Sequence, residues 1–180
     1  ASTEILAAPV VAGNIVLVHT IDNRVAAYDA DTGVSKWILE RPLPVLTLRV
    51  ATGIAVKDQV AYVSTPGGKL IAVALQNGGL RWEVTAAEPK GATELERVVD
   101  MSGAPVVVSN NVCAVTYQGR VGCFDITNGS NRWNKEISSE VGVSADERFV
   151  FAADNQGAVS GYALSGGSNV WRNDKLARRD

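Results

Sequence analysis

One stretch of the sequence decides the fold: Ala27-Tyr28-Asp29-Ala30-Asp31-Thr32-Gly33-Val34-Ser35-Lys36-Trp37. It joins a turn-forming Asp/Thr/Gly segment to a tryptophan that follows the glycine by four residues. The same spacing recurs around each of the four tryptophans: Gly33 and Trp37, Gly78 and Trp82, Gly129 and Trp133, and Gly167 and Trp171. Four copies of one structural unit are therefore present, and a repeat of this kind determines the architecture.

The positions around each pair show what the unit is. Twelve residues before each tryptophan lies an apolar residue, and a β-branched run lies further upstream. Each unit is therefore strand, turn, strand, turn, strand, with a fourth strand supplied by the segment before it. The sequence predicts an all-β chain that is part of one β-propeller domain, with four-stranded antiparallel blades at approximately 4–40, 46–86, 104–138 and 140–172.

Two copies carry an aspartate eight residues before the tryptophan, namely Asp29 and Asp125. A carboxylate at a turn accepts hydrogen bonds from the N–H groups that follow it, so we expect a structural role for both. One histidine, two cysteines and one methionine leave few side chains for metal or nucleophilic chemistry. We predict no catalytic residue, no metal site and no bound cofactor.

Charge and hydropathy exclude some classes of partner and of location. The 17 Lys and Arg residues nearly balance the 19 Asp and Glu residues, for a net charge of −2, whereas nucleic-acid binding needs a basic excess. No apolar run approaches the roughly 18 residues of a membrane-spanning helix. The first residues, Ala1 to Glu4, lack the basic start and apolar middle of a signal peptide.

The spacing of the repeats locates two long connections. Successive tryptophans are 45, 51 and 38 residues apart, so the extra residues fall within 40–52 and 83–103. These segments link the outer strand of one blade to the inner strand of the next, and in a meander all such links emerge on one face. Long loops on a rigid scaffold are the usual site of binding, although neutral insertion is an alternative.

The first repeat resembles the PQQ-like propeller family, whose pattern is Ala-x-Asp-x-x-Thr-Gly-x-x-x-Trp. All five specified positions match at Ala27, Asp29, Thr32, Gly33 and Trp37. The resemblance includes quinoprotein dehydrogenases, so a fragment of a PQQ-dependent enzyme is one alternative function. Those enzymes use a Ca²⁺ site, a catalytic Asp and usually two adjacent cysteines, whereas the two cysteines here are ten residues apart. A sensor or scaffold with another ligand is a further alternative.

Two segments between the repeats are more specific. Leu46-Thr47-Leu48-Arg49 and residues 91–100 resemble the outer-membrane assembly factor (BamB) family of the β-barrel assembly machinery, the Bam complex. The resemblance implies an eight-bladed ring, of which this chain is about half. It also implies a non-enzymatic periplasmic lipoprotein at the inner leaflet of the outer membrane, with the lipid anchor outside this chain. The implied partners are BamA and unfolded outer-membrane proteins, with no nucleic acid and no small-molecule substrate.

The same resemblance singles out Leu46, Leu48 and Arg49 as a contact with BamA. Alternation along an extended segment puts both leucines on one side and Arg49 on the other, as a short edge for β-addition. The alternative is that both leucines are the first core residues of the next blade. The charged residues of the second link either bind a partner or fix their own loop; they are Glu94, Arg97 and Asp100.

Cys113 and Cys123 lie on consecutive strands of one expected hairpin. If its loop is Tyr117-Gln118-Gly119, the two cysteines face each other and a disulfide is possible in an oxidising compartment. A two-residue turn would shift the register by one and prevent the bond.

A half ring also leaves two blade faces without a neighbour. We therefore expect self-association or reduced stability of the chain by itself.

Overall fold

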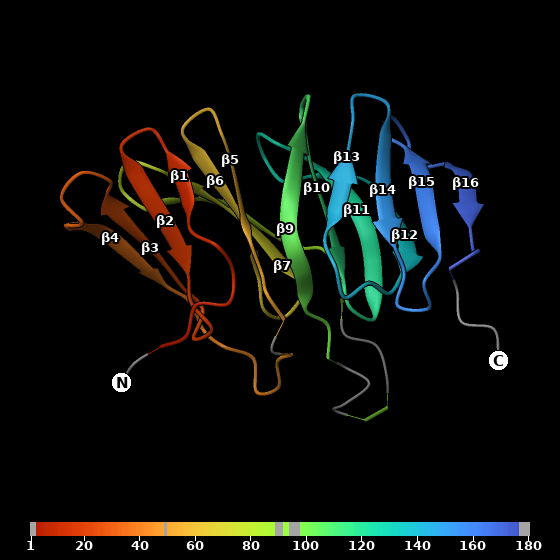
Figure 1. Ribbon diagram of the computed structural model, residues 1–180, viewed down its shortest axis with the longest axis horizontal. Helices are drawn as coiled ribbons and strands as arrows, with labels where there is room; N and C mark the ends of the chain where they lie inside the picture. Colours follow the sequence, from red (N-terminus) through yellow and green to blue (C-terminus); the bar gives the residue numbers. More distant parts are fainter. Residues whose placement is uncertain (1–2, 49, 89–91, 94–97, 177–180) are drawn as a thin grey trace.

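The computed structural model describes residues 3–48, 50–88, 92–93 and 98–176. Within these ranges the chain forms four antiparallel sheets of four strands, and in each sheet the strands pair in sequence order. The sheets stand side by side along the long axis of the molecule (Figure 1). We call them blades 1 to 4. None of the described residues forms a helix long and apolar enough to cross a membrane.

The strand bounds follow the repeats. Blade 1 contains β1 (Val10–Ala12), β2 (Ile15–His19), β3 (Arg24–Asp29) and β4 (Ser35–Glu40). Blade 2 contains β5 (Ile54–Lys57), β6 (Val60–Thr65), β7 (Lys69–Ala74) and β8 (Leu80–Thr85). Blade 3 contains β9 (Met101–Val108), β10 (Asn111–Thr116), β11 (Gly119–Asp125) and β12 (Asn131–Ile137). Blade 4 contains β13 (Val143–Ala145), β14 (Phe149–Ala153), β15 (Val159–Ala163) and β16 (Asn169–Asn173).

The blades begin at residues other than those expected: blade 1 begins at Val10 rather than near residue 4, and blade 4 begins at Val143 rather than near residue 140. Blade 2 begins at Ile54 rather than near residue 46, and blade 3 begins at Met101, before residue 104. The residues just before Ile54 bond to the next blade as well as to their own, in which the Ser64 N–H donates to the Gly53 carbonyl oxygen at 3.1 Å. The Gly103 N–H donates to the Ala51 carbonyl oxygen at 3.0 Å, and the Gly53 N–H donates to the Gly103 carbonyl oxygen at 3.2 Å. The chain therefore touches blade 3 before it enters blade 2.

The core lies between the blades. Successive side chains of a strand point to opposite faces, and in β6 both faces are buried, so all six of its residues are buried. Alternate residues of blade 2 thus join two different clusters, one shared with blade 1 and the other with blade 3. A third cluster joins blades 3 and 4. Each sheet is stabilised mainly by its neighbours, since a single sheet has no interior of its own.

A tryptophan from each of the first three blades joins it to the next. The indole Nε1 donates to a backbone carbonyl oxygen of that next blade: Trp37 to Leu75 at 2.7 Å, Trp82 to Ile126 at 3.1 Å, and Trp133 to Leu164 at 2.8 Å. The ring covers the glycine three residues after the acceptor, namely Gly78, Gly129 or Gly167. A Cβ atom on Gly78 would lie 2.7 Å from the Trp37 ring, and the φ of +71° is left-handed. Both the close approach of the indole and the left-handed φ therefore require glycine at position 78.

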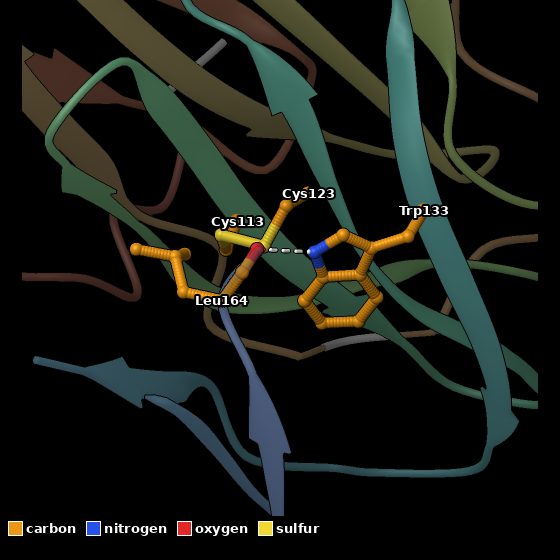
Figure 2. Close-up of a disulfide and its surroundings, with 4 residues drawn as sticks. All are labelled: Cys113, Cys123, Trp133 and Leu164. Carbon is orange, nitrogen blue, oxygen red and sulfur yellow. Dashed lines mark hydrogen bonds between the residues drawn. A yellow bond between two sulfur atoms is a disulfide. The ribbon is translucent and has the colours of Figure 1, made fainter. Parts of the chain in front are cut away.

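The blade 3 hairpin has the register of a three-residue loop. Cys113 faces Cys123, and Gln118 at the tip has a left-handed φ of +50°. The two cysteines form a disulfide, with their Cα atoms 4.1 Å apart and both residues fully buried. Figure 2 shows this bond beside Trp133, whose indole donates to Leu164 of blade 4. The disulfide therefore ties the hairpin on the face that blade 4 covers.

Removing one buried indole tests the role of the tryptophans. We expect Trp82→Ala to lower the free energy of unfolding by about 3–5 kcal/mol, because it empties a site between two blades. Trp171→Ala, at the same position of the repeat, should cost about 1 kcal/mol or less, because that side chain is already 41% exposed. Urea unfolding at low protein concentration measures both. Equal losses would contradict docking as the source of stability.

A thiol titration tests the disulfide. The unfolded, non-reduced chain should show no free thiol, and reduction should lower the free energy of unfolding by about 2–4 kcal/mol. The control is the double variant Cys113→Ala, Cys123→Ala, whose stability should not respond to reductant. Two reactive thiols in the untreated chain would refute the bond.

Candidate functional site on the link face

The long connections gather at one edge of the molecule. The first link (residues 41–53) joins β4 to β5, and the second link (residues 86–100) joins β8 to β9. The described parts of both links, residues 41–48 and 50–53 of the first and 86–88 and 98–100 of the second, lie along the lower edge in Figure 1, beside the turns between the second and third strands. We call this edge the link face. The expectation that both elaborations share one face is confirmed.

Asp100 fixes the two links to each other. Its carboxylate accepts a hydrogen bond from the Leu48 N–H of the first link. Its other oxygen accepts from the Gly67 N–H, in the turn between β6 and β7, at 2.7 Å. The residue is 2% exposed, so these backbone groups, rather than water, surround the carboxylate. Such charge-assisted bonds are stronger than neutral ones and hold both loops in one conformation.

His19 fixes the other part of the first link. Its Nδ1 lies 2.7 Å from Thr52 Oγ1, and its Nε2 lies 3.2 Å from Asn23 Oδ1. The Asn23 side chain in turn donates to the Pro42 carbonyl oxygen at 2.9 Å. Burial lowers the pKa of His19, because the charged imidazolium loses its water. The neutral ring therefore joins blade 1 to both ends of the link.

An ion-pair cluster holds the start of the same link. Arg41 pairs with Glu83 at the end of blade 2, and Lys69 Nζ lies 2.7 Å from the second oxygen of that carboxylate. The Lys69 hydrogen bond is the main reason that the pKa of Glu83 is lowered. The first link is therefore anchored at residue 41, at residue 48 and at residue 52.

Apolar side chains are exposed on this anchored link. Val45 is 97% exposed, and Leu43 and Leu46 are 45% and 44% exposed. Other exposed apolar residues stand nearby at the N-terminal segment and at the turn between β2 and β3; they are Ile5, Leu6 and Ile21. The N-terminal segment is bonded to that turn, because the Ile21 N–H donates to the Glu4 carbonyl oxygen at 2.9 Å. Exposed apolar groups that gather on a fixed surface are a sign of an interaction site.

A pocket of about 200 Å³ opens among these elements. Leu6, Ile21 and Leu48 provide much of its apolar wall, and the polar groups of His19 and Asp100 lie at its lining. The pocket therefore lies between the N-terminal segment, the turn between β2 and β3 and the first link. An apolar pocket with a few polar groups is a candidate binding site.

The predicted contact residues differ in their exposure and in their contacts. Leu46 is exposed and Leu48 is half-buried, and both precede β5, so neither belongs to a core cluster between blades. The segment bends at Val45 and Leu46 rather than forming an extended edge. Arg49, Glu94 and Arg97 lie outside the described residues. For Asp100, the contacts favour the alternative in which the carboxylate fixes its own loops.

Sequence reasoning missed the role of His19 and the contribution of the N-terminal segment. The spacing of residues around His19 in the sequence indicates no partner for its imidazole. The nearest signal was the polar run of Thr20, Asp22 and Asn23 after an apolar strand. The decisive partner, Thr52, lies 33 residues away in the sequence.

The two repeat aspartates hold turns. Asp29 Oδ1 accepts from the Thr32 N–H at 3.0 Å, and its Oδ2 lies 3.0 Å from Lys36 Nζ. Bonds from Lys36 and then Thr32 lower the pKa of Asp29 to about 2. Asp125 accepts from the Thr127 N–H at 2.8 Å and pairs with Arg132 at 2.5 Å. In the part of the chain that the structure describes, no three His, Cys, Asp or Glu side chains are grouped to hold a metal.

Blades joined by a tryptophan over a glycine turn, with a repeat of the PQQ-like pattern, define a β-propeller of the PQQ-like class. The chain belongs to the outer membrane protein assembly factor BamB family, whose model matches residues 1–173. A relative from Burkholderia pseudomallei (strain K96243), named outer membrane protein assembly factor BamB, is 42% identical over 178 residues. That match covers 98% of this chain and 47% of the relative. The chain spans about half the length of the curated relatives it matches.

Solved structures agree on the fold. BamB from Moraxella catarrhalis superposes with a TM-score of 0.89 at 23% identity, over 99% of this chain and 54% of that one. The quinohemoprotein alcohol dehydrogenase from Comamonas testosteroni has a TM-score of 0.81 at 16% identity, over 97% of this chain and 35% of that one. At these identities both likenesses show the fold alone.

Removing the Asp100 carboxylate tests how the link face is held. Asp100→Ala leaves the Leu48 and Gly67 N–H groups without this acceptor, so we expect a loss of about 1–3 kcal/mol for each buried group. Asp100→Asn keeps one acceptor oxygen and should lose less. Urea unfolding gives the stability, and hydrogen exchange of the two amides gives the local effect. Asp31→Ala, on an exposed turn, is the control, and unchanged exchange at both amides would contradict this role.

Proposed function

We propose that the chain is a non-enzymatic scaffold of the β-barrel assembly machinery that binds BamA through its link face. In this role it works in the periplasm, at the inner leaflet of the outer membrane, and assists the folding and insertion of outer-membrane proteins. Its family membership supports the machinery, because the relatives are named outer membrane protein assembly factors. The link face is chosen as the binding surface because its apolar side chains are exposed and its first link is held by several contacts.

The observation that carries the proposal is an exposed apolar segment on an immobilised backbone. Exposed apolar residues on a flexible loop would lose conformational freedom on binding, and that loss opposes association. Here three anchors hold the first link: the Arg41 pair with Glu83, the Leu48 bond to Asp100, and the Thr52 contact with His19. Leu46 is therefore presented in one position before any partner arrives.

Leu46 and Leu48 contribute to this surface in different ways. Leu46 is exposed and available as an anchor for a pocket on BamA. Leu48 is half-buried at the pocket of the link face, so it shapes the floor on which a partner side chain would rest. Asp100 is a positioning residue, since it acts through the Leu48 backbone. In the proposal, Arg49 adds a group with several N–H donors, suited to a carboxylate on BamA.

Alanine substitutions with a matched control test this surface. Leu46→Ala or Leu48→Ala should weaken binding of purified BamA by about 1–3 kcal/mol if the residue is an anchor, and should leave the melting temperature nearly unchanged. Leu80→Ala is the control, because Leu80 is also 44% exposed but begins β8, at the edge opposite the link face. Binding is measured by pull-down and by calorimetry.

Two outcomes would contradict the proposal. Unchanged capture of BamA after Leu46, Leu48 and Arg49 are all replaced would remove the site. A large loss of thermal stability in Leu48→Ala would show that this residue supports the fold rather than the contact. An equal effect of Leu80→Ala would show that the substitutions act non-specifically.

The enzyme alternative has a test of its own. The PQQ-like repeat pattern from Ala27 to Trp37 keeps a PQQ-dependent function as the second candidate. Addition of PQQ and Ca²⁺, followed by absorbance and alcohol-oxidation assays, separates the two. A saturable spectral change with turnover would favour the enzyme over the scaffold.

A further inference from the structure

Two turns of this chain contain an asparagine directly before a glycine. They are Asn77-Gly78, between β7 and β8, and Asn128-Gly129, between β11 and β12. This dipeptide is chemically labile, because glycine has no side chain to hinder attack of its backbone nitrogen on the asparagine amide. The other two blades have a different residue at this position of the repeat, namely Thr32 in blade 1 and Gly166 in blade 4.

Both turns hold the reacting groups in hydrogen bonds. The Gly78 N–H donates to the Ala74 carbonyl oxygen at 2.9 Å, and Asn77 Oδ1 accepts from the Gly79 N–H at 2.9 Å. The turn of blade 3 has the same bonds at the same lengths, from the Gly129 N–H to the Asp125 carbonyl oxygen and from the Ser130 N–H to Asn128 Oδ1. The nitrogen that would attack is therefore engaged, and the amide that it would attack is held by another N–H.

The indole of the preceding blade covers each glycine. Gly78 and Gly129 are buried, although the asparagine before each of them is exposed. A Cβ atom on either glycine would lie 2.7 Å from the covering ring, which is Trp37 for Gly78 and Trp82 for Gly129. Water can reach the asparagine amide, but the glycine nitrogen has no room to turn toward it while the indole is docked.

We propose that Asn77 and Asn128 are sites of spontaneous deamidation, which react when the covering tryptophan leaves the glycine. The glycine nitrogen gives up its proton and bonds to the asparagine Cγ, and the bond from Cγ to the amide nitrogen breaks. That nitrogen takes up the proton and leaves as ammonia, so a cyclic succinimide remains. Water then opens the ring. Cleavage at Cγ gives aspartate, and cleavage at the main-chain carbonyl carbon gives isoaspartate.

The two products affect the interface between blades differently. Aspartate keeps a side-chain oxygen for the same N–H group, as Asp125 Oδ1 accepts from the Thr127 N–H at 2.8 Å. Isoaspartate adds a methylene group to the main chain, which is about 1.5 Å of extra length directly before the glycine. The indole already packs tightly on that glycine, so the longer turn no longer fits beneath it. A transient opening between two blades therefore becomes permanent.

Peptide mapping by mass spectrometry gives the first test. The chain is incubated at mildly alkaline pH, either folded or in guanidinium chloride, and deamidation of each asparagine is followed over time. We expect Asn77 and Asn128 to react about 10-fold or more slowly in the folded chain, because only the locally opened fraction reacts. Asn155 is the internal control, since it is exposed in a turn but is followed by Gln156. Equal rates in both states would overturn the proposal, and so would no reaction at either site in the unfolded chain.

Two tryptophan variants test which indole protects which asparagine. Trp37→Phe should accelerate deamidation of Asn77 only, and Trp82→Phe that of Asn128 only, because each indole covers one turn. Phenylalanine keeps an aromatic ring in the site but lacks the indole N–H, and circular dichroism verifies that each variant is folded. Hydrogen exchange of the covered glycine N–H should rise in parallel, since the same bond must open. Equal acceleration of both asparagines in a folded variant would overturn control by docking.

The products are compared to separate added charge from added main-chain length. Asn128→Asp carries the charge without the extra methylene, so it should unfold at nearly the same urea concentration as the parent chain. Aged protein with isoaspartate at position 128 should unfold at a lower concentration and show faster exchange of the Gly129 N–H. The double variant Asn77→Thr, Asn128→Thr has the residue of blade 1 at both positions and should not lose stability on ageing. Exchange at Gly129 as slow in the isoaspartate form as in the parent would refute permanent opening.

Discussion

The joining of the four blades depends on a tryptophan that each of the first three blades places on the next one. The indole fills space that only a glycine leaves open, and its N–H donates to a carbonyl oxygen in the turn between the third and fourth strands of the next blade. Because the contact always runs from one blade to the following one, it sets the direction of the assembly as well as its spacing. The core clusters between the sheets follow from this placement, and each sheet buries both faces only where it has two neighbours.

This rigid body explains why the loops of one edge can be functional. The first link is bonded to blade 1 through His19, to blade 2 through Glu83 and to the second link through Asp100. The backbone that carries its exposed apolar side chains is thus held by three separate elements. A surface built in this way is suited to holding a partner in a defined orientation. That property fits a protein whose relatives are named assembly factors better than it fits a flexible receptor.

The parts that could be predicted from sequence are those fixed by local spacing. The distance from Gly33 to Trp37 recurs in every unit, and with the alternation of apolar residues it predicted four antiparallel blades, which the structure confirms. The blade 3 register depended on one residue of loop length, which the left-handed Gln118 decides in favour of three. The link face was beyond such reasoning, because its geometry comes from contacts such as His19 with Thr52 and Asp100 with Leu48. No periodicity indicates that His19 pairs with Thr52, 33 residues away, or that Leu48 pairs with Asp100, 52 residues away.

The separation of Leu48 from Asp100 has a consequence for the order of folding. Blade 1 can close its hairpins as soon as its own residues are available, since those contacts are local and form early. The first link reaches its final shape only after blade 2 and the second link have followed it, because its main fastening is supplied 52 residues later. A nascent or partly folded chain therefore has ordered blades before it has an ordered link face. In the proposed function, binding of a partner would then require the second link as well as the first.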